Sequence, residues 1–220
     1  MNVQIPAELD RQQALRYLGI SGVPDSSTSA LLDRAEAALR RSAQPRAVTV
    51  YAGRGQMDAY CTETDIQKHL AGCTGCILLG CSLGAGVDTA MRVASASDMA
   101  YAVVLDALAS VLIEMIADQA EQQLRQTLQG AGLFLTGRFS PGYGDWPIEV
   151  QNDLIRLLDA PRKIGLCATE THLLVPRKSI TAIMGTADHP VSGHLAGCAH
   201  CTLREKCRYR KEGKTCDTSI

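Results

Sequence analysis

Hydrophobic residues recur at helical spacing in four parts of the chain. The spacing predicts helices over residues 7–18, about 25–43, 97–129 and 148–158. The pair Ser97 and Asp98 is a suitable start for the third helix and Gly130 a suitable end, because short polar residues cap helix N-termini and glycine follows C-termini. The first half of this helix is apolar on nearly every side, so we expect a long helix at the centre of the fold.

Shorter alternating or β-branched segments predict strands between these helices. They are residues 46–52, 73–80, 133–137, 163–168 and 179–184. Glycines within residues 53–55 indicate a turn, so the first strand is expected to return as a hairpin toward residue 62, followed by a short helix over residues 64–70. Helices and strands do not alternate regularly, which favours an α+β fold with a twisted antiparallel or mixed sheet packed with helices.

Length and charge narrow the class of protein. At 220 residues the chain can form one main domain, and its net charge of −1 provides no basic field for nucleic acid or an anionic membrane. The first residues do not read as an export signal, and no uninterrupted apolar run approaches the roughly 18 residues of a membrane span. We therefore expect a cytoplasmic protein without nucleic-acid or membrane partners, whose nine cysteines are reduced.

Cysteines divide the chain into a main domain, residues 1–190, and a cysteine-rich tail, residues 191–220. The tail contains four closely spaced thiols interleaved with basic residues: Cys198, Cys201, Cys207 and Cys216. Four thiolates suit tetrahedral zinc or an iron–sulfur cluster, and His194 or His200 could replace one of them. The alternative is a tail of unliganded, reduced thiols. A second group, Cys73, Cys76 and Cys81, falls in an apolar strand, where cysteine usually serves as a small buried hydrophobe.

Residues 138–147, RFSPGYGDWP, cannot form regular structure because two prolines and two glycines occur in ten positions. The segment groups side chains that suit a small ligand. Arg138 can hold a carboxylate through two parallel hydrogen bonds, and Tyr143 and Trp146 can stack on a base or face a cation. Gly142 and Gly144 leave the backbone open to a ligand. A stiff structural turn is the alternative interpretation of the same residues.

Three acids interrupt the apolar part of the long helix. Asp106, Glu114 and Asp118 are eight and four residues apart, which places them near one helix face. Such residues either mark the solvent-exposed side of the helix, or they are buried acids that have charged partners or a function in a site. Elsewhere, Gly84 and Gly86 follow a predicted strand, but two glycines alone are weak evidence for a phosphate-binding turn.

Several of these segments together resemble the activation region of cobalamin-dependent methionine synthase. The shared blocks are R-x-x-P-G-Y-x-x-x-P from Arg138, Q-x-x-L-x-x-L-L from Gln151, I-G-L-x-x-T-E from Ile164 and K-S-I-x-x-I from Lys178. The segment ALASVLIEMIAD, residues 107–118, is similar to the helix of that family that carries a glutamate at the S-adenosylmethionine site.

The resemblance implies a function and a set of site residues. S-adenosylmethionine would be bound by Glu114 and by the loop residues Arg138, Ser140, Pro141, Gly142 and Tyr143. The chain would support reductive reactivation of cobalamin on a separate corrinoid methyltransferase, with flavodoxin or ferredoxin as the reductant and no catalytic nucleophile of its own. Another interpretation keeps the fold but makes the protein a metal or iron–sulfur redox or assembly module for a corrinoid protein that no longer binds S-adenosylmethionine.

Overall fold

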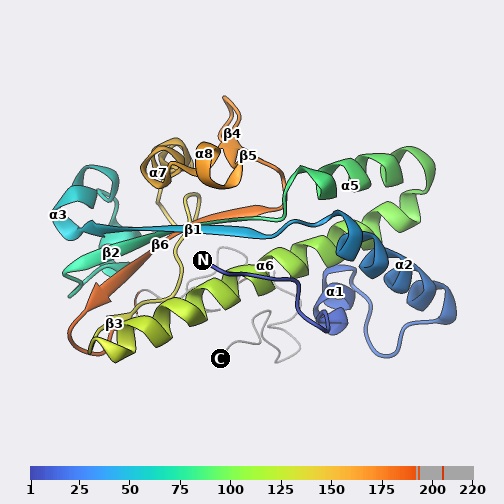
Figure 1. Ribbon diagram of the computed structural model, residues 1–220, viewed down its shortest axis with the longest axis horizontal. Helices are drawn as coiled ribbons and strands as arrows, with labels where there is room; N and C mark the ends of the chain where they lie inside the picture. The colour runs from blue at the N-terminus through green and yellow to red at the C-terminus, as the bar shows by residue number, and fades with distance from the viewer. Residues whose placement is uncertain (192, 194–204, 206–220) are drawn as a thin grey trace.

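A computed structural model describes residues 1–191, 193 and 205. Its centre is an antiparallel sheet of four strands in the order β1-β2-β6-β3 (Figure 1). The bounds are β1 Arg46–Gly53, β2 Gly75–Ser82, β3 Phe134–Leu135 and β6 Ser179–Ala187. Every residue of β2 is buried because the strand has neighbours on both edges and helices on both faces.

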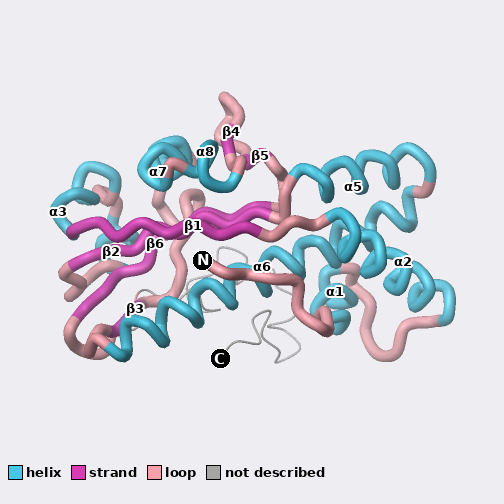
Figure 2. Tube along the Cα trace, viewed as in Figure 1, coloured by secondary structure: helices cyan, strands magenta, loops and turns pink. Residues whose placement is uncertain are grey.

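Helices cover both faces of this sheet (Figure 2). The first face carries α1 Arg11–Tyr17, α2 Ser26–Ser42, α5 Ala85–Ser97 and α6 Met99–Gly130. The second carries the short helices α3 Arg54–Met57 and α4 Thr64–His69, a 3-10 turn Asp58–Tyr60, and the helices α7 Val150–Leu158 and α8 Ala160–Ile164. Alternation along β2 builds the two cores: Ile77 and Leu79 pack toward α6, whereas Cys76 and Leu78 pack toward α7.

The long helix α6 forms as predicted. Asp98 is its N-cap, and its side chain accepts a hydrogen bond from the backbone N–H of Tyr101. By length and composition α6 could cross a membrane, but 61% of its most apolar window is buried inside the protein. Its apolar sequence is therefore explained by its position at the centre of the first core. The predicted α+β class, antiparallel sheet and central helix are all confirmed.

Two sequence predictions were wrong. Residues 53–62 do not return as a hairpin: they form α3 and the 3-10 turn, and β1 pairs instead with β2, with Gly53 opposite Gly75. Ile164 ends α8 rather than beginning a strand, so only the two-residue β4 Cys167–Ala168 remains of that prediction. It pairs with β5, Leu174–Val175, as a separate small sheet. In the first place a long-range pairing of β1 with β2 overrides the local pattern.

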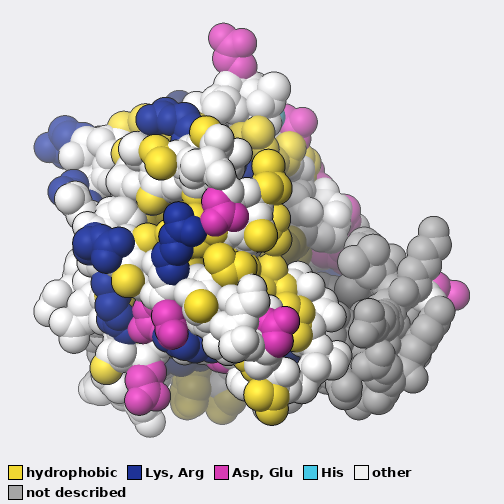
Figure 3. Space-filling model, turned by 90° about the vertical axis from the view of Figure 1, so that its right-hand side faces the viewer, with side chains coloured by type: hydrophobic (Ala, Val, Ile, Leu, Met, Phe, Trp, Pro, Cys, Tyr) yellow, Lys and Arg dark blue, Asp and Glu magenta, His cyan; other side chains and the backbone are white. Residues whose placement is uncertain are grey.

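The structure also bears on the glycines after β2 and on the surface charge. Gly86 lies so close to the backbone of Ser42 that a Cβ would collide with it, which explains this glycine by packing of α5 against the end of α2. The end of the molecule formed by α2 and α5 shows basic and acidic side chains mixed with apolar ones (Figure 3). This mixture agrees with the nearly balanced charge of the sequence.

Candidate functional site

The loop of residues 138–147 is fixed to the sheet at its first residues. Phe139 forms a bridge with Ile183 of β6, through backbone N–H to O distances of 2.9 and 2.8 Å. Neighbouring residues in an extended segment point to opposite faces of a sheet. Phe139 therefore packs in the second core, while Arg138 points toward α6 on the first face.

The far end of the loop is structural. Trp146 is only 1% exposed, and its Nε1 donates to the carbonyl oxygen of Tyr60 at 2.7 Å. The indole is therefore not available to stack on a ligand. Asp145 accepts hydrogen bonds from the backbone N–H groups of Thr64 and Asp65, at 3.1 and 3.0 Å, and so caps α4 from across the chain. The stiff-turn interpretation is confirmed for this part of the loop.

Arg138 contacts three carboxylates of α6. Its Nη2 lies 2.8 Å from Asp118 Oδ1 and 3.3 Å from Glu114 Oε2, and its Nη1 lies 3.2 Å from Glu121 Oε2. Nη1 is buried and, within the part of the chain that the structure describes, has no well-aligned hydrogen-bond acceptor despite that ion pair. Burial would lower the pKa of Arg138, but Asp118, Glu121 and Glu114 raise it overall, so the guanidinium is charged.

Among the residues that the structure describes, this cluster carries an excess of negative charge. Glu121 also pairs with Arg125 at 2.6 Å, so three carboxylates of α6 face two guanidinium groups. The side chains of Glu114 and Asp118 are about half exposed, whereas Arg138 is only 19% exposed. A ligand approaching from solvent therefore meets carboxylates first and the guanidinium behind them. Such a surface favours a ligand with a net positive charge that also carries a carboxylate.

The backbone immediately before Arg138 is held from two sides. Arg125 donates to the carbonyl oxygens of Leu135 and Thr136, at 2.5 and 2.9 Å. His69 of α4 lies with its Nε2 3.0 Å from Thr136 Oγ1 and 3.0 Å from the carbonyl oxygen of Gly137. These contacts fix the position from which the Arg138 side chain departs.

The other predicted ligand residues lie between these two anchored ends. Pro141 is buried and Ser140 partly buried, so neither presents its whole side chain to solvent. Gly142 adopts a positive φ of 89°, which favours glycine, and its N–H bonds the carbonyl oxygen of Trp146 at 2.8 Å. Tyr143 is half exposed and meets Phe139 edge-on at 6.1 Å. Burial of its hydroxyl end, and then the charge of Glu114, raise the pKa of Tyr143.

A pocket of about 620 Å³ lies on the same side of α6 as Glu114. It is lined by the end of α1, the first half of α6 and the start of β6, three segments that are far apart in sequence (Figure 1). Its polar lining side chains are Asp106, Ser110, Glu114, Arg177, Lys178 and Ser179, and Tyr17 lies among its apolar residues. Tyr17 and Lys178 were not identified as site residues from the sequence. No local pattern marks Tyr17, and Lys178 was noted only as the first residue of the block K-S-I-x-x-I; Asp106 shares the helix face predicted for Glu114.

The cysteines that the structure describes are not arranged as a metal site. Cys61, Cys73, Cys76 and Cys81 are buried free thiols, as the sequence predicted for the last three, and Cys167 is exposed. Among the described residues, no group of three or more His, Cys, Asp or Glu side chains is placed to hold a metal ion. The predicted ligands Cys198, Cys201, Cys207 and Cys216 lie outside the described residues.

Comparisons with known proteins establish the fold. No protein-family model matches the chain, and no curated protein sequence matches it. A solved structure described as the crystal structure of the MetH reactivation domain bound to AdoHcy (S-adenosylhomocysteine) is similar, with a TM-score of 0.60 and 14% sequence identity. The similarity covers 94% of this chain and 82% of that chain. The fold expected from the sequence motifs is thus confirmed.

Proposed function

We propose that this protein binds S-adenosylmethionine beside Arg138 and Glu114 and serves in the reductive reactivation of a separate corrinoid methyltransferase. The observation that carries the proposal is the contact between Arg138 and Glu114. The family resemblance named these two residues in separate motifs, and they meet at 3.3 Å although they are 24 positions apart. The fold similarity to a reactivation domain bound to S-adenosylhomocysteine supports the same interpretation.

The charges of the ligand match those of the cluster. S-adenosylmethionine has an α-carboxylate, an α-ammonium group and a sulfonium, so its net charge is positive. The guanidinium of Arg138 would bind the carboxylate, and the half-exposed carboxylates of Glu114 and Asp118 would accept the ammonium group and stabilise the sulfonium. Tyr143 and the backbone of Ser140 and Gly142 would line the open side of the ligand. The role of this chain is thus to bind and orient, which is how proximity accelerates a transfer.

The reaction requires partners of defined chemistry. One electron from a flavodoxin- or ferredoxin-type reductant would reduce cob(II)alamin on the partner protein. The sulfonium methyl group would then pass to the reduced cobalt, leaving S-adenosylhomocysteine and methylcobalamin. The transfer requires no covalent bond to a side chain of this chain. We place the reaction in the cytoplasm, where buried free thiols such as Cys76 and Cys81 remain reduced.

Calorimetric titration with S-adenosylmethionine tests the binding step. We expect binding by the wild-type protein and a loss of affinity of at least about 100-fold in Arg138→Ala, because two charge-assisted hydrogen bonds of about 1.5 kcal/mol each would be lost. Arg138→Lys keeps the charge but not the paired geometry and should recover only part of the affinity. Arg162→Ala is the matched control, since Arg162 is highly exposed and pairs only with Asp159 among the residues described.

Thermal unfolding of each variant shows whether it is folded. If the wild type gives no binding heat with S-adenosylmethionine at any ionic strength, or if folded Arg138→Ala binds as tightly as the wild type, the proposed site is wrong. The reactivation step needs a second assay. The protein, a reductant and the partner in its cob(II)alamin form are mixed with S-adenosylmethionine that carries ¹³C in its sulfonium methyl group. Labelled methylcobalamin is the expected product, and its absence in a mixture that binds the ligand would refute the reactivation role.

A further inference from the structure

The pocket beside Glu114 continues the proposed ligand site along α6. Glu114, Ser110 and Asp106 follow one another at intervals of four residues, so they line one face of the helix. At a rise of about 1.5 Å per residue, Asp106 is about 12 Å along the axis from Glu114. A ligand that reaches from Arg138 to Asp106 would therefore be bound in an extended form.

Asp106 is held in place by a nearly buried lysine. Lys178 Nζ lies 3.0 Å from Asp106 Oδ1 and donates to Ser110 Oγ at 2.8 Å. The lysine side chain is 11% exposed, whereas that of Asp106 is 47% exposed. The lysine therefore orients the carboxylate, which is about half exposed and lines the pocket. An oriented carboxylate is a suitable acceptor for the paired hydroxyls of a ribose, as it is in dinucleotide-binding folds.

Tyr17 provides the aromatic surface that a base requires. It is half exposed, lies at the end of α1 and lines the same pocket as Asp106 and Glu114. Glu114, which contacts Arg138 and also lines the pocket, connects the loop at Arg138 with the pocket that Tyr17 borders. An exposed aromatic ring in such a position can stack on an adenine.

We infer that this pocket binds the nucleoside half of the ligand, with Asp106 accepting from the ribose hydroxyls, Tyr17 packing on the base and Lys178 positioning Asp106. The inference rests on the proposed function for the amino-acid half of the ligand. The nucleoside contacts, however, do not involve Arg138, so adenosine alone should occupy the pocket.

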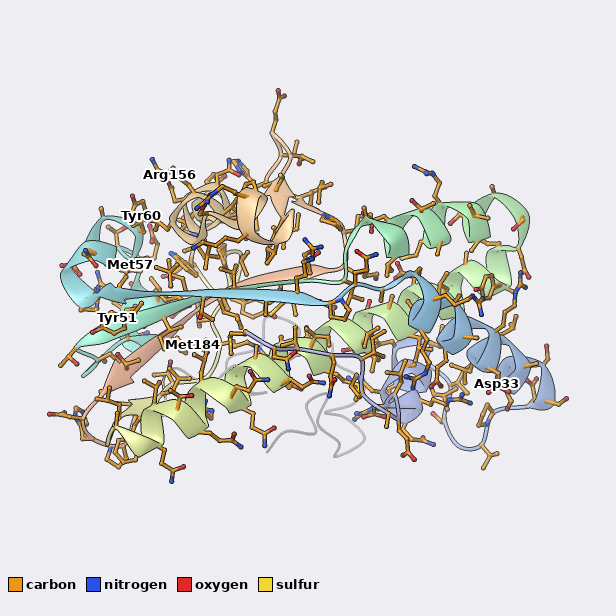
Figure 4. The ribbon with its side chains drawn as sticks, viewed as in Figure 1. Asp33, Tyr51, Met57, Tyr60, Arg156 and Met184 are labelled. Carbon is orange, nitrogen blue, oxygen red and sulfur yellow. The ribbon has the colours of Figure 1, made fainter. Side chains whose placement is uncertain are left out.

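Binding of S-adenosylhomocysteine by calorimetry and of adenosine by ligand-observed NMR tests the inference. Asp106→Asn and Tyr17→Leu should each weaken both ligands about 10- to 100-fold, whereas Arg138→Ala should weaken S-adenosylhomocysteine and leave adenosine unchanged. Asp33→Asn and Tyr51→Leu are matched controls, because Asp33 on α2 and Tyr51 on β1 are exposed and lie away from the pocket (Figure 4). Both controls should bind as the wild type does.

A comparison of adenosine with 2′-deoxyadenosine shows whether Asp106 contacts the ribose directly or affects binding only through folding. Adenosine should bind the wild type more tightly than 2′-deoxyadenosine, and this difference should disappear in Asp106→Asn. If S-adenosylhomocysteine binds and requires Arg138 while the Asp106 and Tyr17 variants bind normally, the pocket assignment is wrong and the proposed function stands. If adenosine binds both the wild type and Arg138→Ala but S-adenosylmethionine gives no heat, the pocket assignment stands and the proposed function fails. Absence of binding by either ligand overturns both.

Discussion

Replacement of Trp146 tests whether the loop of residues 138–147 is a rigid platform. The indole is 1% exposed, packs beside Phe139 with ring centres 6.0 Å apart, and donates to the carbonyl oxygen of Tyr60 at 2.7 Å. Truncation of a buried tryptophan to alanine costs about 4 kcal/mol. In a protein of 220 residues that loss corresponds to a fall in melting temperature of about 8–16 °C. Trp146→Phe keeps most of the ring but leaves the Tyr60 carbonyl without its donor, at a cost of about 1–2 kcal/mol.

Urea denaturation followed by far-UV circular dichroism measures these changes in the free energy of unfolding. Tyr143→Ala is the control in the same loop, because Tyr143 is half exposed and should cost much less than Trp146. Trp146 is the only tryptophan, so the fluorescence of the wild type reports its environment directly and should be blue-shifted in the native state. A loss below about 1 kcal/mol in Trp146→Ala would refute the anchoring role, since it would fall well below the usual cost of a buried aromatic truncation.

Three further predictions concern the same loop, the buried thiols and the tail. Gly144→Ala should destabilise the protein measurably in the same urea titration, because Gly144 has a positive φ of 55° and a Cβ would collide with the Asp65 side chain. Burial raises the pKa of Cys76 and Cys81 from 9.0 to about 12. Their contribution to the free energy of unfolding is therefore complete below about pH 9 and is lost as pH rises toward 12. Cys81→Ala should reduce this loss of stability at alkaline pH. Elemental analysis of anaerobically purified protein should find bound zinc or iron, and the metal content should be lower in Cys201→Ser. If the wild type contains no metal, the metal site is wrong and the thiols of the tail are free.

The electrostatics of the α6 cluster bear on ligand choice. Arg138 is surrounded by Glu114, Asp118 and Glu121, so a neutral zwitterion gains less from the site than a ligand with an additional positive charge. S-adenosylmethionine is therefore expected to bind more tightly than S-adenosylhomocysteine, and added salt should reduce the difference between them. The weaker affinity for S-adenosylhomocysteine would favour release of this product after methyl transfer.

The sequence by itself determined the features that depend on local pattern. Apolar residues at helical spacing and the cap at Asp98 defined α6, because helix formation uses contacts within one segment. The motif around Arg138, together with its matching segments, indicated the fold, which the structural comparison confirmed. The burial of Cys76 and Cys81 also followed from the apolar composition of their strand.

Tertiary structure decided everything that depends on contact between distant segments. The partner of β1 is β2 rather than the adjacent residues 57–62, because sheet pairing is governed by burial of whole faces and not by the nearest turn. The loop that looked like one ligand-binding unit is divided: Trp146 anchors the second core, while Arg138 reaches the acids of α6 on the opposite face. The pocket joins α1, α6 and β6, so Tyr17 and Lys178 became candidates only once folding had brought these elements together.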